Sequence, residues 1–379
     1  MRTGCGLSTL EESSAAGRQA ATRAMEVLGG GQPDLALMFF SAHHMSSIDS
    51  LLAPILAELG PGALIGCSSQ AVIGEGREIE QGPAISLFAV SLDMGASVET
   101  FHVRVEDVAD GRALVGFPLF AQTATAVVLL ADPFTFPADA LLKTLNQDHP
   151  GLPVTGGMAG GGDGHSMLVV GNQVVDRGAV GFLLKGVPVT ALVSQGCRPI
   201  GKPFVITEAE DTLITGLAGE PPLRRLQQVV SKLSPEDQQL VSNGLHLGLV
   251  INEATVDPSS GDFLIRAIMN ANTQTGAIVA GDRVSVGQTV QFQLRDAASA
   301  DAELRTMLEL SPAASGALVF SCNGRGVGMF DVPDHDAQAI TDVCGTIPTA
   351  GMFCNGEFGA IGGKNFIHGF TASLALFQD

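Results

Sequence analysis

Apolar positions in this chain fall into short runs typical of buried strands, separated by segments whose apolar residues keep helical spacing. Three of the runs open the same succession of elements, and they span residues 35–40, 126–131 and 317–321. A helix-like stretch follows each run, and then a second strand of glycine and small residues, which begins at Ala63, Pro153 or Pro348. A Gly-rich turn then leads to a third apolar strand, which begins at Ala84, Ala179 or Thr371.

Glycines stand at matching places in the second strand of each unit, at Gly66, Gly156 and Gly351. Repetition at a fixed offset predicts repeated architecture. Three strand-helix-strand modules that share one sheet system would bring their Gly-rich turns close together, which suits a small-molecule pocket. The pattern therefore predicts an α/β fold of mixed sheets, built from three related strand-helix-strand-hairpin units in two halves.

Helical spacing predicts helices over residues 13–28, 48–59, about 138–147, 223–241 and about 300–309. Ser13 is expected to cap the first helix, and Pro54 to kink or shorten the second. Residues 167–195 alternate apolar segments with glycine or polar punctuation, which indicates an antiparallel meander. Residues 196–222 are rich in glycine and proline, so we expect two domains, residues 1–200 and 201–379.

Composition restricts the class of protein. The chain has 379 residues, of which 45% are hydrophobic and 16% charged, so it can bury large cores and is expected to be globular. The first residues lack the apolar segment of a signal peptide, and no apolar run reaches the roughly 18 residues that span a bilayer. We therefore predict a cytoplasmic protein whose six cysteines are free thiols, without a zinc site because no CxxC pair occurs.

The formal net charge of −19 argues against nucleic acid or an anionic membrane as a partner, because both require a basic face. The glycine-dense stretch 156–164, which includes Gly156 and Gly157, lacks the Lys-Ser/Thr ending of a phosphate-binding P-loop. The pattern favours close packing of backbone at these glycines, which are also candidates for ligand contact. No nucleotide or other cofactor is predicted.

Two short motifs at strand ends carry candidate ligand-binding residues. Cys67 and Ser68 end one strand, where a thiol, a hydroxyl and free backbone N–H groups can bind a carboxylate or phosphate. The alternative is a helix cap or a turn with a small buried thiol. Asn355 and Glu357 stand in a glycine-flanked turn, where the carboxylate can meet a ligand amine or simply face solvent.

The segment 321–326 is the sharpest candidate. Cys322 ends an apolar strand, Asn323 follows it, and Arg325 offers a planar fork for a ligand carboxylate. The alternatives are a tight turn with a surface arginine, or a reactive thiol at Cys322 whose pKa a positive neighbour lowers. Outside these motifs, Arg266 interrupts an apolar strand and predicts an internal ion pair with an acid such as Asp296.

Several stretches together resemble the FIST domain proteins (F-box and intracellular signal transduction proteins), in both the FIST N and the FIST C parts. They include LALMFFSAHH, ALIGCSSQAVIGE, PVTGGMAGGG, SQGCRPIGKPFVITEAE, ALVFSCNGRG and GMFCNGEFGAIGG, and they spread over nearly the whole chain. The resemblance implies a sensory role, in which small ligands such as amino acids are bound and the signal passes to fused or separate partners. No fused output domain is evident, so a separate signalling protein is expected.

Three functions therefore stand at this point. The first is a non-enzymatic, cytoplasmic small-ligand-binding sensory module, and it is favoured because no catalytic residue set or metal-ligand spacing is recognisable. The second is a cysteine-dependent hydrolase or transferase that uses Cys322. The third is a protein-interaction scaffold with a closed core.

Overall fold

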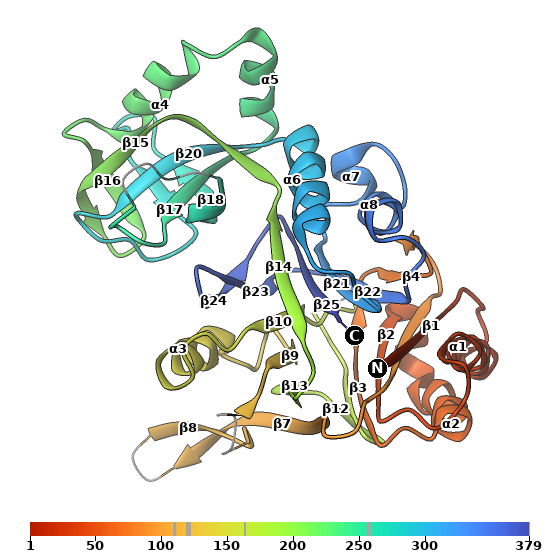
Figure 1. Ribbon diagram of the computed structural model, residues 1–379. Coiled ribbons are helices and arrows are strands. Elements are labelled where there is room, and N and C mark those ends of the chain that lie inside the picture. The colour runs from red at the N-terminus through yellow and green to blue at the C-terminus, as the bar shows by residue number, and fades with distance from the viewer. Residues whose placement is uncertain (109–110, 119–122, 163, 256–257, 259, 379) are drawn as a thin grey trace. The chain divides into compact units, whose positions relative to one another are not determined.

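A computed structural model describes residues 1–108, 111–118, 123–162, 164–255, 258 and 260–378 (Figure 1). The chain forms two compact units, residues 1–194 with 304–379, and residues 195–303. The helices of the described chain are α1 (Ser13–Leu28), α2 (Ile48–Leu59), α3 (Ala138–Asp148), α4 (Pro222–Val230), α5 (Pro235–Asn243), α6 (Ala297–Leu310), α7 (Val327–Phe330) and α8 (His335–Cys344), with 3-10 turns η1 (Ala42–Ser47) and η3 (Ser260–Asp262).

Three mixed sheets build the first unit. The first has the order β1-β6-β2-β3-β11-β12, with β1 (Arg2–Ser8), β6 (Ile85–Ser91), β2 (Leu35–Ser41), β3 (Ala63–Ser69), β11 (Leu168–Val170) and β12 (Gln173–Val175). The second has the order β24-β23-β10-β9-β13-β7-β8, with β24 (Lys364–His368), β23 (Glu357–Ile361), β10 (Val154–Met158), β9 (Ala126–Ala131), β13 (Ala179–Lys185), β7 (Ser97–Val108) and β8 (Gly111–Val115). The third has the order β14-β25-β21-β22-β4-β5, with β14 (Val189–Gln195), β25 (Thr371–Phe377), β21 (Gly316–Cys322), β22 (Thr349–Cys354), β4 (Val72–Gly74) and β5 (Arg77–Ile79).

The three sheets have the same strand-pairing pattern at their centres. A first strand pairs parallel with the next strand of its own segment, as in β2–β3, β9–β10 and β21–β22, and antiparallel with the third strand, as in β2–β6, β9–β13 and β21–β25. The hairpins are exchanged between segments: β4–β5 joins β22, β11–β12 joins β3, and β23–β24 joins β10. The α/β class with mixed sheets is confirmed; the three related units remain a prediction, which this shared pairing supports.

The matching glycines have a common packing reason. Gly66, Gly156 and Gly351 lie opposite Met38, Leu129 and Val319 of the parallel first strands. A Cβ at any of the three would overlap the carbonyl oxygen of that opposite residue. Only glycine allows the two strand backbones to approach in this way.

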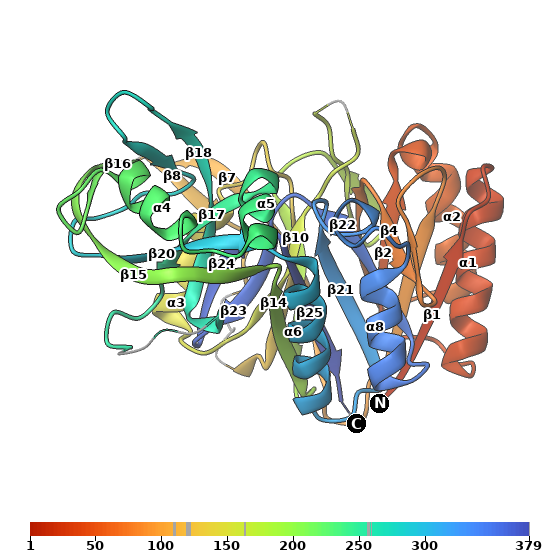
Figure 2. The same ribbon diagram turned by 90° about the horizontal axis from the view of Figure 1, so that it is seen from above.

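Strand side chains of the first unit alternate between two cores. Leu37 and Phe39 of β2 face a core shared with β9, β13, β21, β22 and β25, while Ala36 and Met38 face α1 and α2. In the same way, α3 covers the outer face of β9, and α6 and α8 cover β21 and β25. Figure 2 shows α1 with α2, and α6 with α8, lying along the outer faces of their sheets. Strands buried on both faces explain the continuous apolar runs of the sequence.

The second unit contains a closed barrel in the order β15-β16-β19-β18-β17-β20, with β15 (Cys197–Glu210), β16 (Leu213–Leu217), β19 (Ile278–Ala280), β18 (Phe263–Ala271), β17 (Leu245–Val250) and β20 (Thr289–Arg295). Arg266 forms an ion pair with Asp282 at 2.8 Å, so the predicted pairing is present but its expected partner is wrong. Asp296 instead binds Arg198 at 2.6 Å. Asp282 could not be preferred from the sequence, because strand pairing decides which acid lies near Arg266.

Several local predictions need correction. The meander expected over residues 167–195 is wrong, because β11–β12 joins the first sheet, β13 the second and β14 the third. Glu12, not Ser13, caps α1, and the Ser13 hydroxyl lies 2.9 Å from Nδ1 of the buried His44. Of the kink or shortening expected at Pro54, the shortening does not occur, since α2 runs through to Leu59. Within the described residues, no helix is long and apolar enough to cross a membrane.

Candidate functional site

A pocket of about 400 Å³ lies in the first unit, at the carboxyl ends of strands from all three sheets. Gln70 comes directly after β3 and Phe134 follows β9. Residues 159–162, 164 and 165, here called the glycine loop, follow β10. Asn323 follows β21, and Asn355 follows β22. The carboxyl ends of strands in open α/β sheets are where ligands commonly bind. The geometry thus brings together segments that lie up to about 285 residues apart in the chain.

Asp132, the first residue after β9, forms hydrogen bonds with two segments at this pocket. Its carboxylate accepts hydrogen bonds from the backbone N–H groups of Phe134, at 3.1 Å, and Thr135, at 2.7 Å, which fixes the turn that carries the Phe134 ring. It also accepts a hydrogen bond from the hydroxyl of Ser166, directly after the glycine loop. Asp132 is 2% exposed, so it acts as a support beneath the lining.

The glycine loop is packed tightly at its start and open at its centre. The Gly160 N–H donates to the carbonyl of Ser68 at 2.9 Å. A Cβ on Gly161 would lie 2.5 Å from the Met45 sulfur, so that position has little spare room. Gly162 and Gly164 have φ of +92° and +75°, and a Cβ there would meet open space. Glycine is therefore needed at these two positions for the backbone conformation.

Carboxamide and ring side chains are prominent in the described lining. Gln70, Asn323 and Asn355 contribute carboxamides, and Phe134 and His165 contribute rings. The Oδ1 atom of Asn323 is buried and has no hydrogen-bond partner within the described part of the chain. None of the described lining residues is Asp, Glu, Lys or Arg. Of the predicted ligand contacts, Asn323 and Asn355 line the pocket.

Cys67 and Ser68 lie beneath the pocket and are fully buried. The Cys67 thiol lies 3.3 Å from the sulfur of Met352, and burial raises its pKa. The Ser68 hydroxyl accepts a hydrogen bond from the N–H of Met167 at 2.9 Å. Both side chains are thus engaged within the protein, and both residues lie inside strand β3 and not in a turn.

Gly156 and Gly157 lie inside β10, where they make room for neighbours. A Cβ on Gly157 would lie only 2.6 Å from the Cys354 sulfur, so the absence of a side chain at Gly157 makes room for that sulfur. These two glycines do not belong to the described lining of the pocket. Their geometry agrees with the close backbone packing that the sequence favoured.

A group of thiols and one carboxyl lies below Asn323 and Asn355. Cys322 and Cys354 are opposite each other in the parallel pair β21–β22, and the Cys354 thiol lies 3.7 Å from Oε1 of Glu357. Oε2 of Glu357 accepts from both the N–H and the hydroxyl of Thr371, at 3.2 and 2.8 Å. Burial raises the pKa of Glu357 to about 7, against the opposing effect of these hydrogen bonds. Burial, together with the nearby Glu357 charge, also raises the pKa of Cys322 to about 12.

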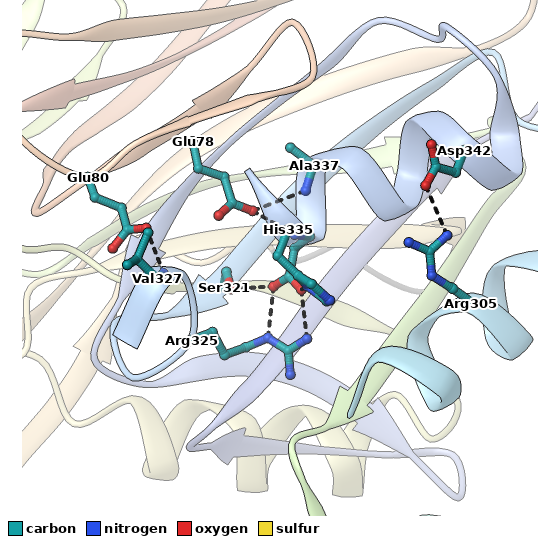
Figure 3. Close-up of polar contacts among 10 residues, drawn as sticks. Glu78, Glu80, Arg305, Ser321, Arg325, Val327, His335, Ala337 and Asp342 are labelled. Carbon is teal, nitrogen blue, oxygen red and sulfur yellow. Dashed lines mark hydrogen bonds and ion pairs between the residues drawn. The ribbon is translucent and has the colours of Figure 1, made fainter. Parts of the chain in front are cut away.

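Arg325 is not among the described lining residues, and its side chain belongs to a buried network (Figure 3). Its guanidinium binds the Asp336 carboxylate through two hydrogen bonds of 2.8 and 2.7 Å, and both residues are 1% exposed. Ser321 donates to the same carboxylate at 2.8 Å. Although burial opposes ionisation, the charge and hydrogen bonds of Arg325 hold the pKa of Asp336 below its usual range. The guanidinium also lies 5.1 Å from the centre of the Phe330 ring.

Glu78, on the exchanged hairpin β4–β5, supports the same network. One of its carboxyl oxygens accepts from the N–H groups of Asp336 and Ala337, at 2.8 and 3.0 Å, at the start of α8. Burial, and then the negative charge of Asp336, raise the pKa of Glu78 to about 8. Glu80 reaches the neighbouring helix α7 by accepting from the Val327 N–H at 2.9 Å.

Sequence reasoning missed Gln70, Phe134, His165 and the supporting Asp132. Gln70 and Asp132 each stand directly after an apolar strand, and that position was the available signal. The acid that binds Arg325 was not predictable in the same way, because the turn and α7 bring Asp336 back to the strand end.

Comparisons with known proteins place the chain among its relatives. The family model described as "FIST N domain" matches residues 34–220, and the one described as "FIST C domain" matches residues 222–360. The chain is 44% identical over 386 aligned positions to an "Uncharacterized protein" of Mycobacterium tuberculosis (strain ATCC 25618 / H37Rv), with 100% of both chains covered. It is 42% identical over 386 positions to an "Uncharacterized protein" of Mycobacterium bovis (strain ATCC BAA-935 / AF2122/97), with 100% of this chain and 99% of the relative covered.

Proposed function

Since the chain belongs to the FIST family, we propose that it is a small-ligand-binding sensory module that acts through a separate signalling protein. FIST domains are associated with signal transduction and small-ligand sensing. The observation that carries the proposal is the pocket of about 400 Å³ at the carboxyl ends of β3, β9, β10, β21 and β22. That volume lies within the range of known small-molecule sites, roughly 300–1,000 Å³.

The expected ligand class, from the resemblance, is amino acids or similar small metabolites. Asn323 and Asn355 would contact the ligand directly, while Asp132 would position the wall that carries Phe134. Arg325 and Glu357 would act indirectly, because their hydrogen bonds to Asp336 and Thr371 hold neighbouring segments in place. The six cysteines are free thiols, which supports a reducing, cytoplasmic location.

The enzyme alternative is weaker than the sensor. A cysteine nucleophile needs a low thiol pKa and access to solvent, whereas Cys322 is 8% exposed and burial raises its pKa to about 12. The scaffold alternative predicts a closed core, in contrast to the open pocket. We therefore keep the ligand-binding module as the conclusion.

The test is a thermal-shift screen of the full chain against amino acids and central metabolites at millimolar concentration, with the Asn355→Ala variant beside the natural chain. Ligand that binds the folded state raises the melting temperature by mass action. We expect a selective rise that Asn355→Ala reduces, because this exposed side chain lines the pocket without supporting the core. A rise of equal size in both proteins would place the ligand elsewhere, and no rise with any compound would contradict the proposal.

A further inference from the structure

Two adjacent cavities, of about 650 and 500 Å³, lie between helix α3 and strand β8 with the residues that follow it (Figure 1). Leu114 of β8 lines both cavities, so they form one depression along the helix, here called the α3–β8 groove. On the helix side, Ala140 lines one cavity, and Leu141 and Leu145 line the other. Both cavities are larger than the ligand pocket, and the proposed function does not use them.

The other two sheets carry a helix at the corresponding place. β1 neighbours β6 in the first sheet, as β7 neighbours β13 in the second and β14 neighbours β25 in the third. Helix α1 packs so closely on β1 that a Cβ on Gly6 would overlap the carbonyl oxygen of Ala20. Leu304 and Leu308 of α6 share a core with β25 and with Leu192 of β14. In the described part of the core over β7 and β13, α3 is the only helix, and the α3–β8 groove lies beside it.

The apolar face of β7 continues beyond the side chains that cover it. Phe101 is buried, with its ring centre 5.0 Å from that of Phe117, and Val103 is also buried. Val105, the next residue on the same face, is half-buried and lines the groove beside its strand partner Leu114. An apolar groove of this size on the surface is typical of a protein-binding site.

Phe134 connects the α3–β8 groove with the ligand pocket, because its side chain lines both. The ring is 67% exposed, and hydrogen bonds from the N–H groups of Phe134 and Thr135 to Asp132 hold the turn that carries it. A small ligand in the pocket and a partner in the groove would therefore contact the same ring. This arrangement gives ligand binding a direct route to a partner surface.

We propose that the α3–β8 groove binds an amphipathic helix of the signalling partner. The apolar stripe of this helix lies against Val105, Leu114 and Phe134, and its flanks carry basic residues. This inference rests on the proposed function, because it assigns the partner-binding surface of the same sensory module.

The form and the charge of the partner follow from separate observations. The helical form follows from α1 and α6, which occupy the corresponding place on the other sheets. Neighbouring helices pack ~8–10 Å apart, which matches about two strand spacings. The basic flanks follow from the net charge of −19, since the described lining itself is nearly balanced, with Asp107 and Asp148 beside Arg112 and His149.

The test is a fluorescence-anisotropy titration of the full chain at ~0.15 M salt, which screens long-range attraction. The probe is a labelled peptide of leucine and lysine, about 18 residues long, with its leucines at helical spacing. A peptide of the same composition with strictly alternating leucine and lysine is the control, because it favours an extended strand. We expect the helical peptide to bind more tightly than the alternating one.

Two variants locate the binding. Phe134→Ala should weaken the helical peptide at least about fivefold, and the exposed position of this ring leaves the fold intact. Arg112→Glu replaces a positive charge whose side chain is 78% exposed in the groove, so it should tighten the binding of the basic peptide. Arg283→Glu is the matched control, because Arg283 is 85% exposed, is also paired with an aspartate, and belongs to the other compact unit. It should change the affinity less than Arg112→Glu.

The contrary outcomes are distinct. Tighter binding of the alternating peptide would overturn the helical form and indicate strand addition at β8. Equal effects of Arg112→Glu and Arg283→Glu, with no effect of Phe134→Ala, would overturn the site, because the overall charge would then explain the binding. No saturable binding of the helical peptide at millimolar concentration would also overturn the proposal. None of these titrations contains a small ligand, so such a failure leaves the ligand pocket to its own thermal-shift test.

Discussion

Breaking the buried ion pair between Arg325 and Asp336 is the perturbation for which the structure predicts the largest electrostatic effect. Arg325→Met keeps much of the aliphatic stem but removes the hydrogen bonds of 2.8 and 2.7 Å to Asp336. The remaining carboxylate, 1% exposed, keeps its contacts with the Ser321 hydroxyl at 2.8 Å and with Nδ1 of His335 at 3.0 Å, but it loses the charge of the guanidinium. Breaking such a pair on one side costs about 3–5 kcal/mol, so we expect the free energy of unfolding to fall by that amount near neutral pH.

A surface pair in the same region provides the control. Arg305 and Asp342 lie 3.1 Å apart, with side chains 34% and 45% exposed (Figure 3). Arg305→Met should therefore cost less than about 1 kcal/mol. The assay is urea denaturation followed by far-UV circular dichroism, since the chain lacks the Trp and Tyr residues used for intrinsic fluorescence.

The pH dependence tests the cause of this effect. In the natural protein the folded-state pKa of Asp336 is lowered, so its contribution is present above the ordinary Asp pKa of about 4 and is lost as pH falls below it. In Arg325→Met the buried carboxyl loses the guanidinium and keeps the hydrogen bonds of Ser321 and His335, so its folded pKa rises and its protonation relieves the cost. The difference between the two proteins should therefore shrink from about pH 7 to about pH 4. A cost for Arg325→Met no larger than that for Arg305→Met, or one that is unchanged by pH, would refute the reasoning.

Three further predictions concern a carboxyl, a glycine and a thiol. The folded pKa of Glu78 is raised to about 8 from its ordinary 4.5, so the free energy of unfolding should fall as pH rises from about 4.5 to about 8. Glu78→Gln should make this pH dependence, measured by urea denaturation, shallower. An unchanged pH dependence in the variant would contradict the assignment. Gly351→Ala should lower the free energy of unfolding by at least about 3 kcal/mol, because its Cβ would overlap a strand carbonyl. Gly328→Ala has open space around the new Cβ and should leave the stability unchanged. Equal midpoints of the two variants in urea would contradict this prediction. Iodoacetamide near neutral pH should modify the half-buried Cys344 before Cys322, as peptide mass spectrometry can measure, and rapid selective labelling of Cys322 would revive the enzyme alternative.

Local patterns predicted the elements well where one physical signal dominates. Helix α1 begins and ends as expected, since its apolar stripe is regular and Gly29, with φ of +81°, ends it. The strand β25 was also predicted to begin at Thr371, where it begins in the structure, because it is apolar on both faces. The common offset of Gly66 and Gly351 was visible as well, and the close backbone approach gives its reason.

Long-range pairing was not predictable from one sequence. Hydrophobic alternation defines β11 and β12 but does not say that they extend β3 of another segment, so a local meander was the natural interpretation. The same limit applies to the site. Strand-end position identified Asn323 and Asn355, but Arg325 looked available for a ligand, because the turn that brings Asp336 to it leaves no periodic signal.

Hydrogen exchange measured by mass spectrometry tests the central claim most directly, because it locates the bound ligand without assuming its class. The full chain would be compared with and without the compound that gives the largest thermal shift. We expect slower exchange in the segments around Gln70, residues 159–162, Asn323 and Asn355, with little change in the compact unit of residues 195–303. Protection confined to other segments, in a protein that clearly binds the compound, would contradict a ligand site at these strand ends.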